Sequence, residues 1–441
     1  MDRWVARWPW YYGWTIVAAS CLALALAMGS RAVIGVLLAA LFDSFDWGRA
    51  AIAGALSVSF VVSTLAAPGW GALMDRWGPR RTLAAAALLA GGGLGVAATT
   101  REPWQLYLGL GLLGGTGLAP FWTTTFGVVI SNWFASRRGL ALGVVAAGSG
   151  LGILLLAPLV QTVIRTVSWQ AAFVVLAALQ LGVVAPLVVV FLRRRPEDFG
   201  LTPDGTRAAP AARPTDGPSI GQALRDARFW CLVVGFPLGI AGHQFILAHG
   251  IAYLVDRGFT ADVAALALSF FGGCTIGGMV LWGYLADRLG GERAYTVGSL
   301  LLLAAVALLY AVEPGRGALL WVFVVVFAIG YGSRQALHAF IAAKLLQGRS
   351  FGALMGWMTA ALSAGSALGP AMGGWVYDAT GSYDSAFALA ALFTAIAVVC
   401  VWLAAPRRGV LRASSPTGDR LPALGADNAP RAAPPAGARR A

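Results

Sequence analysis

The sequence predicts an all-α membrane protein whose twelve transmembrane helices are arranged in two six-helix halves. Three observations support this fold class: the composition is strongly apolar, the apolar residues occur in long runs, and one loop motif appears at the same place in each half. Hydrophobic residues make up 58% of the 441 residues and charged residues only 12%, whereas a soluble globular chain carries about a quarter charged residues. The lipid bilayer is therefore the expected solvent.

The apolar runs approach the roughly 20 residues that a helix needs to cross the bilayer core. They lack the alternating pattern of a membrane β-barrel, and a helix is the other structure that satisfies its own backbone in lipid. The first run extends to Leu41 without a cleavage site, so we interpret it as a retained span rather than a signal peptide. The predicted spans are 13–41, 49–73, 80–98, 104–131, 139–164, 169–192, 229–255, 263–286, 294–312, 319–343, 352–376 and 385–404.

These spans divide the chain into four expected parts. Residues 1–192 form the N-terminal half and residues 229–405 the C-terminal half. Between them, residues 193–228 are rich in Arg, Pro, Ala and Gly and too polar to enter lipid, so they are expected to form a cytoplasmic linker. The tail 406–441 has too little apolar content to fold alone and is expected to be disordered and cytoplasmic.

The distribution of cations predicts the orientation in the membrane. If both termini are cytoplasmic, 25 of the 32 lysines and arginines face the cytoplasm, as the positive-inside rule requires. Only five then face outward, namely Arg49, Arg101, Arg165, Arg257 and Arg316. Because the arginines lie in short loops instead of one stripe, the net charge of +13 indicates topology, and no nucleic-acid partner is expected.

One loop motif occurs twice, between spans two and three as GALMDRWGPRR and between spans eight and nine as GYLADRLGGER. This duplicated motif resembles the signature of the major facilitator superfamily, which implies a transporter with two rocking halves. A carboxylate beside arginines near a helix end can latch neighbouring helices on the cytoplasmic face and favour the outward-open state; solvated loop charges are the alternative. The candidate latch residues are Gly71, Asp75, Arg76, Gly78, Arg80, Arg81, Gly283, Asp287, Arg288 and Gly290.

Further segments, which together span most of the chain, narrow the resemblance. Residues 12–14, 46–49, 132–143 and 369–383 resemble monocarboxylate-carrier relatives. The start of the linker, 195–205, is similar to that of bacterial members, including oxalate:formate antiporter-like proteins. The resemblance implies a small organic anion such as a monocarboxylate as the substrate, and the bacterial inner (plasma) membrane as the location.

Two arginines, Arg31 and Arg334, lie inside predicted spans, where an isolated charge is costly and usually faces a cavity. Arg31 lies roughly 15 Å from the outer end of its span, and the resemblance places a functional cation at this position. In the superfamily, helices one and ten line the central cavity, so one anion could bridge both guanidinium groups. Tyr331, one turn from Arg334, is a further candidate; snorkelling to the interface is the alternative for Arg334.

Proton coupling has only histidines as candidates, since all nineteen acidic residues lie in loops, termini or span ends. His338 lies four residues after Arg334 and shares its helix face. We consider His338 and His243 as proton carriers and His338 also as a substrate contact, with packing or hydrogen bonding as the alternative. Uniport, proton symport and anion exchange all stay open.

Enzymatic function is not expected, because the sequence contains no phosphate-binding loop, metal-ligand cluster or nucleophile motif. The four cysteines lie in apolar runs without metal-ligand spacing. We therefore expect no cofactor and no metal, and a monomer whose partners are a small anionic substrate and the bilayer. One rival is a drug or hydrophobic-compound exporter of the same fold, which acidic cavity residues would have supported. Another is a non-transporting membrane sensor, which would need an added signalling domain.

Overall fold

The computed structural model describes residues 10–45, 47, 49–205, 218–348, 350–380 and 383–405. These residues are mostly helical and contain no strand, and they belong to one compact unit, Met1–Ala405. Ten helices in this part of the chain are long and apolar enough to cross a membrane. The all-α fold class is therefore confirmed, while the predicted tail lies outside the described residues.

In the first half, several of the six predicted spans are divided into shorter helices. In chain order they are α1 (Tyr12–Ala32), α2 (Ile34–Ser44), α3 (Arg49–Ala98), α4 (Pro103–Leu106), η2 (Tyr107–Gly114), α5 (Gly115–Leu118), α6 (Thr123–Trp133), α7 (Arg138–Thr166), α8 (Trp169–Leu179), η3 (Gln180–Val184) and α9 (Ala185–Phe191). Span one is divided at Val33, and spans two and three form the single element α3, which leaves helical geometry at Gly78. Span four breaks around Pro120, which has no backbone N–H to donate to a helical hydrogen bond. The backbone is extended at Trp122, just before α6 begins.

The second half follows the predicted spans more closely. Its helices are α11 (Ala227–Asp256), α12 (Ala261–Leu289), α13 (Gly291–Ala311), α14 (Gly317–Leu346), α15 (Phe351–Thr380) and α16 (Tyr383–Ala404). The described ends of the linker carry two 3-10 turns, η4 (Glu197–Phe199) and η5 (Pro203–Gly205), and the short helix α10 (Ile220–Arg225).

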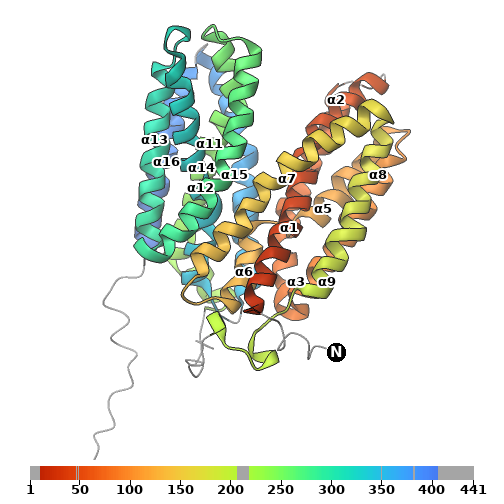
Figure 1. Cartoon of the computed structure of the whole chain (residues 1–441), viewed down its shortest axis with the longest axis vertical. Helices are drawn as coiled ribbons and strands as arrows, with labels where there is room; N and C mark the ends of the chain where they lie inside the picture. The colour runs from red at the N-terminus through yellow and green to blue at the C-terminus, as the bar shows by residue number, and fades with distance from the viewer. Residues whose placement is uncertain are drawn as a thin grey trace, which may run out of the picture. The chain divides into compact units, whose positions relative to one another are not determined.

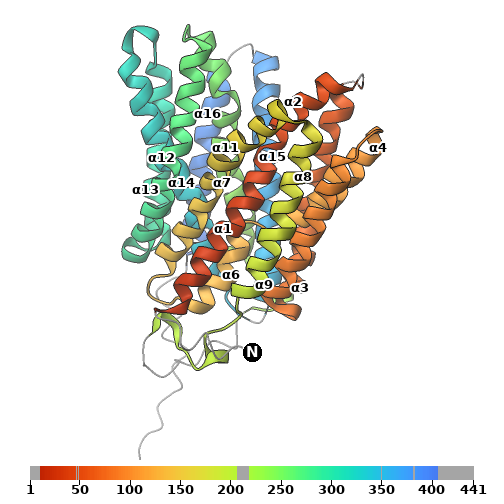
Figure 2. The same ribbon diagram turned by 45° about the vertical axis from the view of Figure 1, so that its right-hand side comes forward.

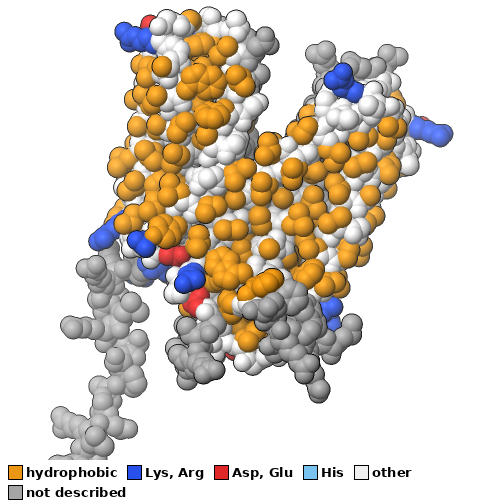
Figure 3. Space-filling model, viewed as in Figure 1, with side chains coloured by type: hydrophobic (Ala, Val, Ile, Leu, Met, Phe, Trp, Pro, Cys, Tyr) orange, Lys and Arg blue, Asp and Glu red, His pale blue; other side chains and the backbone are white. Residues whose placement is uncertain are grey.

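Within this unit, α1–α9 form one group of helices and α11–α16 the other (Figure 1; turned by 45° in Figure 2). The two groups meet through two extensive contacts, α3 with α15 and α7 with α12. We call the end at which α3 bends at Gly78 and α12 ends the latch end. There the groups lie together, whereas at the opposite end Figure 3 shows a notch between them.

A buried polar contact also links the groups away from the latch end. The hydroxyl groups of Thr124 in α6 and Thr359 in α15 lie 2.7 Å apart, and both side chains are almost fully buried. The two groups are thus in direct contact at this level. Any opening of the latch end would have to break this contact.

Candidate functional site

Asp75, near the middle of α3, contacts the opposite half through both carboxylate oxygens. Oδ1 accepts a hydrogen bond from the backbone N–H of Gly352 at 2.8 Å, and Oδ2 accepts one from Ala353 at 2.9 Å. Both donors lie in the first turn of α15, where backbone N–H groups have no partner within the helix. The carboxylate therefore caps the positive end of that helix dipole.

Asp287, at the equivalent position of the second motif, makes the same contact in the reverse direction. Its Oδ1 accepts a hydrogen bond from the backbone N–H of Gly139 at 2.7 Å, and its Oδ2 accepts one from Leu140 at 2.9 Å. These donors begin α7 of the first half. Each half thus supplies one carboxylate to cap a helix of the other.

Small residues allow the backbones to come this close. A Cβ atom on Gly71 would collide with the carbonyl oxygen of Gly352, and one on Gly283 with that of Gly139. The motif glycines and the capped helices therefore form two matched close contacts at the latch end. In lipid, such contacts between small residues favour tight helix association.

The third residue after each aspartate has a positive φ angle, 78° at Gly78 and 85° at Gly290. Only glycine adopts this region without a steric penalty, which explains its place in both copies of the motif. The arginines of the motif behave differently from the carboxylates. In the described part of the chain none of them bonds either aspartate, and Arg288 instead lies over the Tyr284 ring, 4.6 Å from its centroid.

Arg31, near the end of α1, contacts described residues of the first half. Its Nη2 donates a hydrogen bond to Ser63 Oγ at 3.0 Å, and the guanidinium carbon lies 5.5 Å from the Phe60 ring and 6.0 Å from the Trp122 ring. Nε and Nη1 are buried without a hydrogen-bond partner. Arg31 thus presents two unused donors in an aromatic setting.

Arg334, in α14, is completely buried in the second half. Its guanidinium carbon lies 4.2 Å from the centroid of the Tyr295 ring of α13, and a Cβ atom on Gly239 of α11 would lie 3.5 Å from the same carbon. Its three side-chain nitrogens have no hydrogen-bond partner, and neither has the Tyr295 hydroxyl. A cation–π contact of this kind offsets only part of the cost of a buried charge.

The two candidate histidines lie near Arg334. His338 packs against Phe236, with ring centroids 4.3 Å apart, and its Nε2 is unpaired. His243 Nδ1 lies 2.9 Å from the carbonyl oxygen of Gly239, while its Nε2 is also unpaired. The Tyr331 ring stands edge-on to His243 at 4.8 Å. The Tyr295 ring contacts both Arg334 and His338. The sequence-predicted His243, Tyr331, Arg334 and His338 thus lie in one region of the second half.

The structure does not bring Arg31 and Arg334 into one cavity, contrary to our expectation from the sequence. The groups around Arg31 come from α1, α3 and the segment before α6, whereas those around Arg334 come from α11, α13 and α14. Because Arg334 has no accessible surface, it lines no cavity in this conformation. It also does not snorkel to the interface, since its side chain is enclosed by protein.

Sequence reasoning missed the residues that hold the linker against the first half. Asp204 Oδ2 accepts hydrogen bonds from the backbone N–H groups of Ala135 and Ser136 at 2.9 and 2.6 Å. The Asp204 N–H in turn donates to the Tyr11 hydroxyl at 3.1 Å, and that hydroxyl donates to the carbonyl oxygen of Trp133. Burial raises the pKa of Tyr11 above its ordinary value. The positive φ of Asp204, 59°, is a local signal visible only in the structure.

Sequence comparisons agree with this architecture. A family model described as "Major Facilitator Superfamily" matches residues 20–342 and 250–431. Monocarboxylate transporter 13 of Rattus norvegicus is 29% identical over 387 residues, which cover 87% of this chain and 86% of that protein. The oxalate:formate antiporter of Oxalobacter formigenes is 29% identical over 265 residues, covering 58% of this chain and 59% of that protein.

Solved structures give the same fold. The Escherichia coli fucose:proton symporter FucP superposes with a TM-score of 0.67 at 15% identity, covering 89% of this chain and 98% of that one. The human organic anion transporter MFSD10 superposes with a TM-score of 0.66 at 17% identity, covering 89% and 99%. The chain therefore belongs to the Major Facilitator Superfamily and is a multi-pass membrane carrier rather than an enzyme.

Proposed function

We propose that this carrier moves a small organic anion, such as a monocarboxylate, across the membrane by alternating access. The names of two relatives support this substrate class, since the rat protein is named for monocarboxylates and the Oxalobacter protein for oxalate and formate. The remaining support comes from the charges inside the helices of this chain.

The observation that carries the proposal is a buried guanidinium group with unpaired nitrogens in each half. Arg31 leaves two nitrogens and Arg334 leaves three without a hydrogen-bond partner. Neither arginine forms an ion pair with a described residue. An unpaired buried charge costs several kcal/mol, and an arriving carboxylate would offset this cost by accepting hydrogen bonds from the planar guanidinium fork. An anion thus suits this interior better than a cation does.

His338 and His243 are the proposed groups for proton coupling. Each has one unpaired ring nitrogen in the neighbourhood of Arg334. The positive charge of Arg334 opposes a second positive charge nearby, whereas a carboxylate bound at Arg334 would stabilise a protonated imidazole. Anion and proton would then move together as a symport. Without that protonation, the same site would serve uniport or anion exchange.

The proposed cycle uses the latch end as the gate. Asp75 and Asp287 would hold the two halves together while the notch at the opposite end admits substrate, and their release would open the latch end. We assign the latch end to the cytoplasm from the arginine excess of its loops. The described conformation would then be open to the outside.

We extend the proposal to location and organisation. The carrier would lie in a bacterial inner membrane as a monomer, with both termini in the cytoplasm. Residues 1–192 and 229–405 would move as two halves joined by the linker 193–228. Thiol labelling of single cysteines from each side of sealed vesicles tests this orientation.

The test of the substrate class is calorimetric binding of a panel of mono- and dicarboxylates to purified protein. Arg31→Gln and Arg334→Gln should each weaken carboxylate binding at least tenfold. The matched control is Arg101→Gln, which removes an exposed arginine outside the long helices and should bind like the parent. If both interior variants bind carboxylates as tightly as the parent, the anion proposal fails. Binding of hydrophobic cations instead would favour the exporter.

A further inference from the structure

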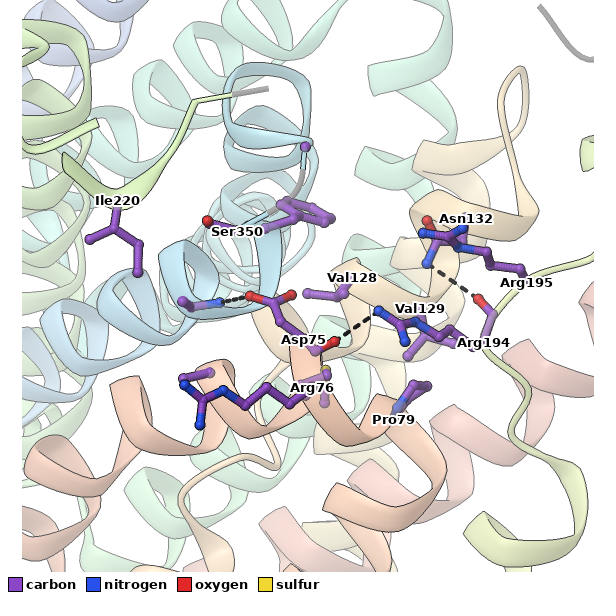
Figure 4. A pocket seen from close by; sticks show the side chains of 15 residues that line it. Asp75, Arg76, Pro79, Val128, Val129, Asn132, Arg194, Arg195, Ile220 and Ser350 are labelled. Atoms are coloured by element: carbon purple, nitrogen blue, oxygen red, sulfur yellow. Dashed lines mark hydrogen bonds between the residues drawn. The ribbon is translucent and has the colours of Figure 1, made fainter. Parts of the chain in front are cut away.

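A pocket of about 580 Å³ lies at the latch end, separate from Arg31 and Arg334. Its walls come from both halves and from the linker, since α3 supplies Arg76, α6 supplies Asn132, the linker supplies Arg194 and Arg195, and Ser350 precedes α15. Figure 4 shows Asp75 between Arg76 on one side and Arg194 on the other. The pocket therefore adjoins one of the two carboxylate caps.

Positive charge dominates this pocket. Among its described lining residues there are three arginines and one carboxylate, that of Asp75. Both carboxylate oxygens of Asp75 already accept hydrogen bonds from α15, and Arg194 donates to the backbone carbonyl oxygen of Asp75 at 2.8 Å. Arg76 and Arg195 are exposed and form no hydrogen bond or ion pair within the described part of the chain. Two guanidinium groups are thus free to bind a ligand.

We propose that this pocket binds a phosphate group and that its occupant holds the latch end closed. A planar guanidinium group can bind two phosphate oxygens at once. Two or three arginines can neutralise the two negative charges of a phosphate group, whereas a monocarboxylate carries only one charge. Ser350 adds a hydroxyl to the same wall. The volume lies within the range of small-molecule sites and exceeds what a bare ion fills. The ligand class is therefore a phosphate monoester, either soluble or a lipid headgroup.

The effect on conformation follows from the origin of the walls. Arg76 belongs to the first half and Ser350 adjoins α15 of the second, so the pocket has this form only while the halves meet at the latch end. A ligand that binds one conformation shifts the equilibrium towards it. At ten times its dissociation constant, the occupant would lower the fraction of open latch ends about tenfold. The pocket would thus act as a brake on the transport cycle.

The experiment measures latch-end opening without any carboxylate, so its outcome is independent of the proposed substrate. Thr359→Cys is made in a chain whose four native cysteines are replaced, because Thr359 is 1% exposed between the halves. Labelling by an impermeant thiol reagent then reports opening of the latch end. Inorganic phosphate is compared with chloride at equal ionic strength, and nanodiscs containing phosphatidic acid are compared with phosphatidylcholine nanodiscs.

Phosphate at ten times its dissociation constant should slow labelling about tenfold and should have no effect on the Arg76→Gln/Arg195→Gln variant. The matched control is Arg225→Gln, which removes an exposed arginine of α10 that does not line the pocket and should keep full protection. Protection by inorganic phosphate supports a soluble ligand, whereas protection by phosphatidic acid alone supports a lipid headgroup. The proposal is overturned if neither slows labelling, or if the double variant is protected as well as the parent.

Discussion

Asp75 and Asp287 each cap a helix of the opposite half. Asp75 of α3 accepts hydrogen bonds from the first turn of α15, and Asp287 of α12 accepts them from the first turn of α7. The two contacts are equivalent in donor type, in distance and in position within the motif. Neither involves a motif arginine. The latch therefore rests on carboxylates and helix dipoles, and each half contributes one copy.

Asparagine at either aspartate should slow transport more than it weakens substrate binding. Asn retains one acceptor oxygen but loses the charge and places an amide N–H against a backbone N–H, which costs about 1–2 kcal/mol. Maximal rates in proteoliposomes should fall about tenfold for Asp75→Asn or Asp287→Asn, while the calorimetric dissociation constant changes less than threefold. An equal loss of affinity with an unchanged maximal rate would contradict the latch.

The glycines of the latch should be sensitive to a single methyl group. Gly71→Ala places a Cβ against the carbonyl of Gly352, whereas Gly69→Ala, two residues earlier in α3, meets nothing within 4 Å. Overpacking at such a contact costs about 1–3 kcal/mol. Labelling of Cys at position 359 from the latch end should therefore be about tenfold faster in Gly71→Ala and unchanged in Gly69→Ala. Equal rates in both would show that the close contact does not hold the gate.

The sequence alone predicted the parts of the site whose chemistry is local. The duplicated motif indicated two equivalent loops, and Gly78 and Gly290 indeed share a positive φ. The motif could not indicate which helix Asp75 would cap, because the donor Gly352 lies 277 residues away in the chain. Backbone N–H groups leave no sequence signal, so the arginines of the motif looked like better partners than they are.

The surroundings of the Arg334 side chain could not be predicted from the sequence for a related reason. Its place inside span ten was predicted correctly, but α14 is apolar on most of its surface. Helical periodicity therefore does not distinguish faces that meet lipid, a neighbouring helix or a cavity. Tyr295, which covers the guanidinium group, gave no signal in span nine, since a tyrosine within a span is compatible with any of these surroundings.

The linker contact predicts an alkaline pH dependence of stability. Burial raises the pKa of Tyr11 in the folded protein above its unfolded value of about 10. The neutral phenol therefore contributes stability that is complete below pH 10 and is lost as the pH rises through the folded pKa. The melting temperature should fall more between pH 9 and pH 11 in the parent than in Tyr11→Phe, as measured by fluorimetry in detergent. Parallel curves would exclude Tyr11 as the titrating group.

Lysine should replace Arg31 better than it replaces Arg334. Arg31 makes one directional contact, from Nη2 to Ser63 Oγ, and otherwise lies beside aromatic rings, so an ammonium group can supply the same charge and one hydrogen bond. Arg334 lies with its guanidinium 4.2 Å from the Tyr295 ring and leaves three nitrogens unpaired, a geometry that a point charge does not reproduce.

Calorimetry with the best carboxylate of the panel measures this difference. Arg31→Lys should bind within about threefold of the parent, and Arg334→Lys should bind at least tenfold more weakly. Correct folding is checked by the melting temperature and by the elution volume of each variant, since Arg334 is fully buried and its replacement could act through packing. If Arg334→Lys folds and binds like the parent, the fork geometry has no role and Arg334 contributes charge alone. If Arg31→Lys loses binding as fully as Arg31→Gln, then Arg31 needs its two unpaired nitrogens, and the bidentate contact belongs to helix α1 instead.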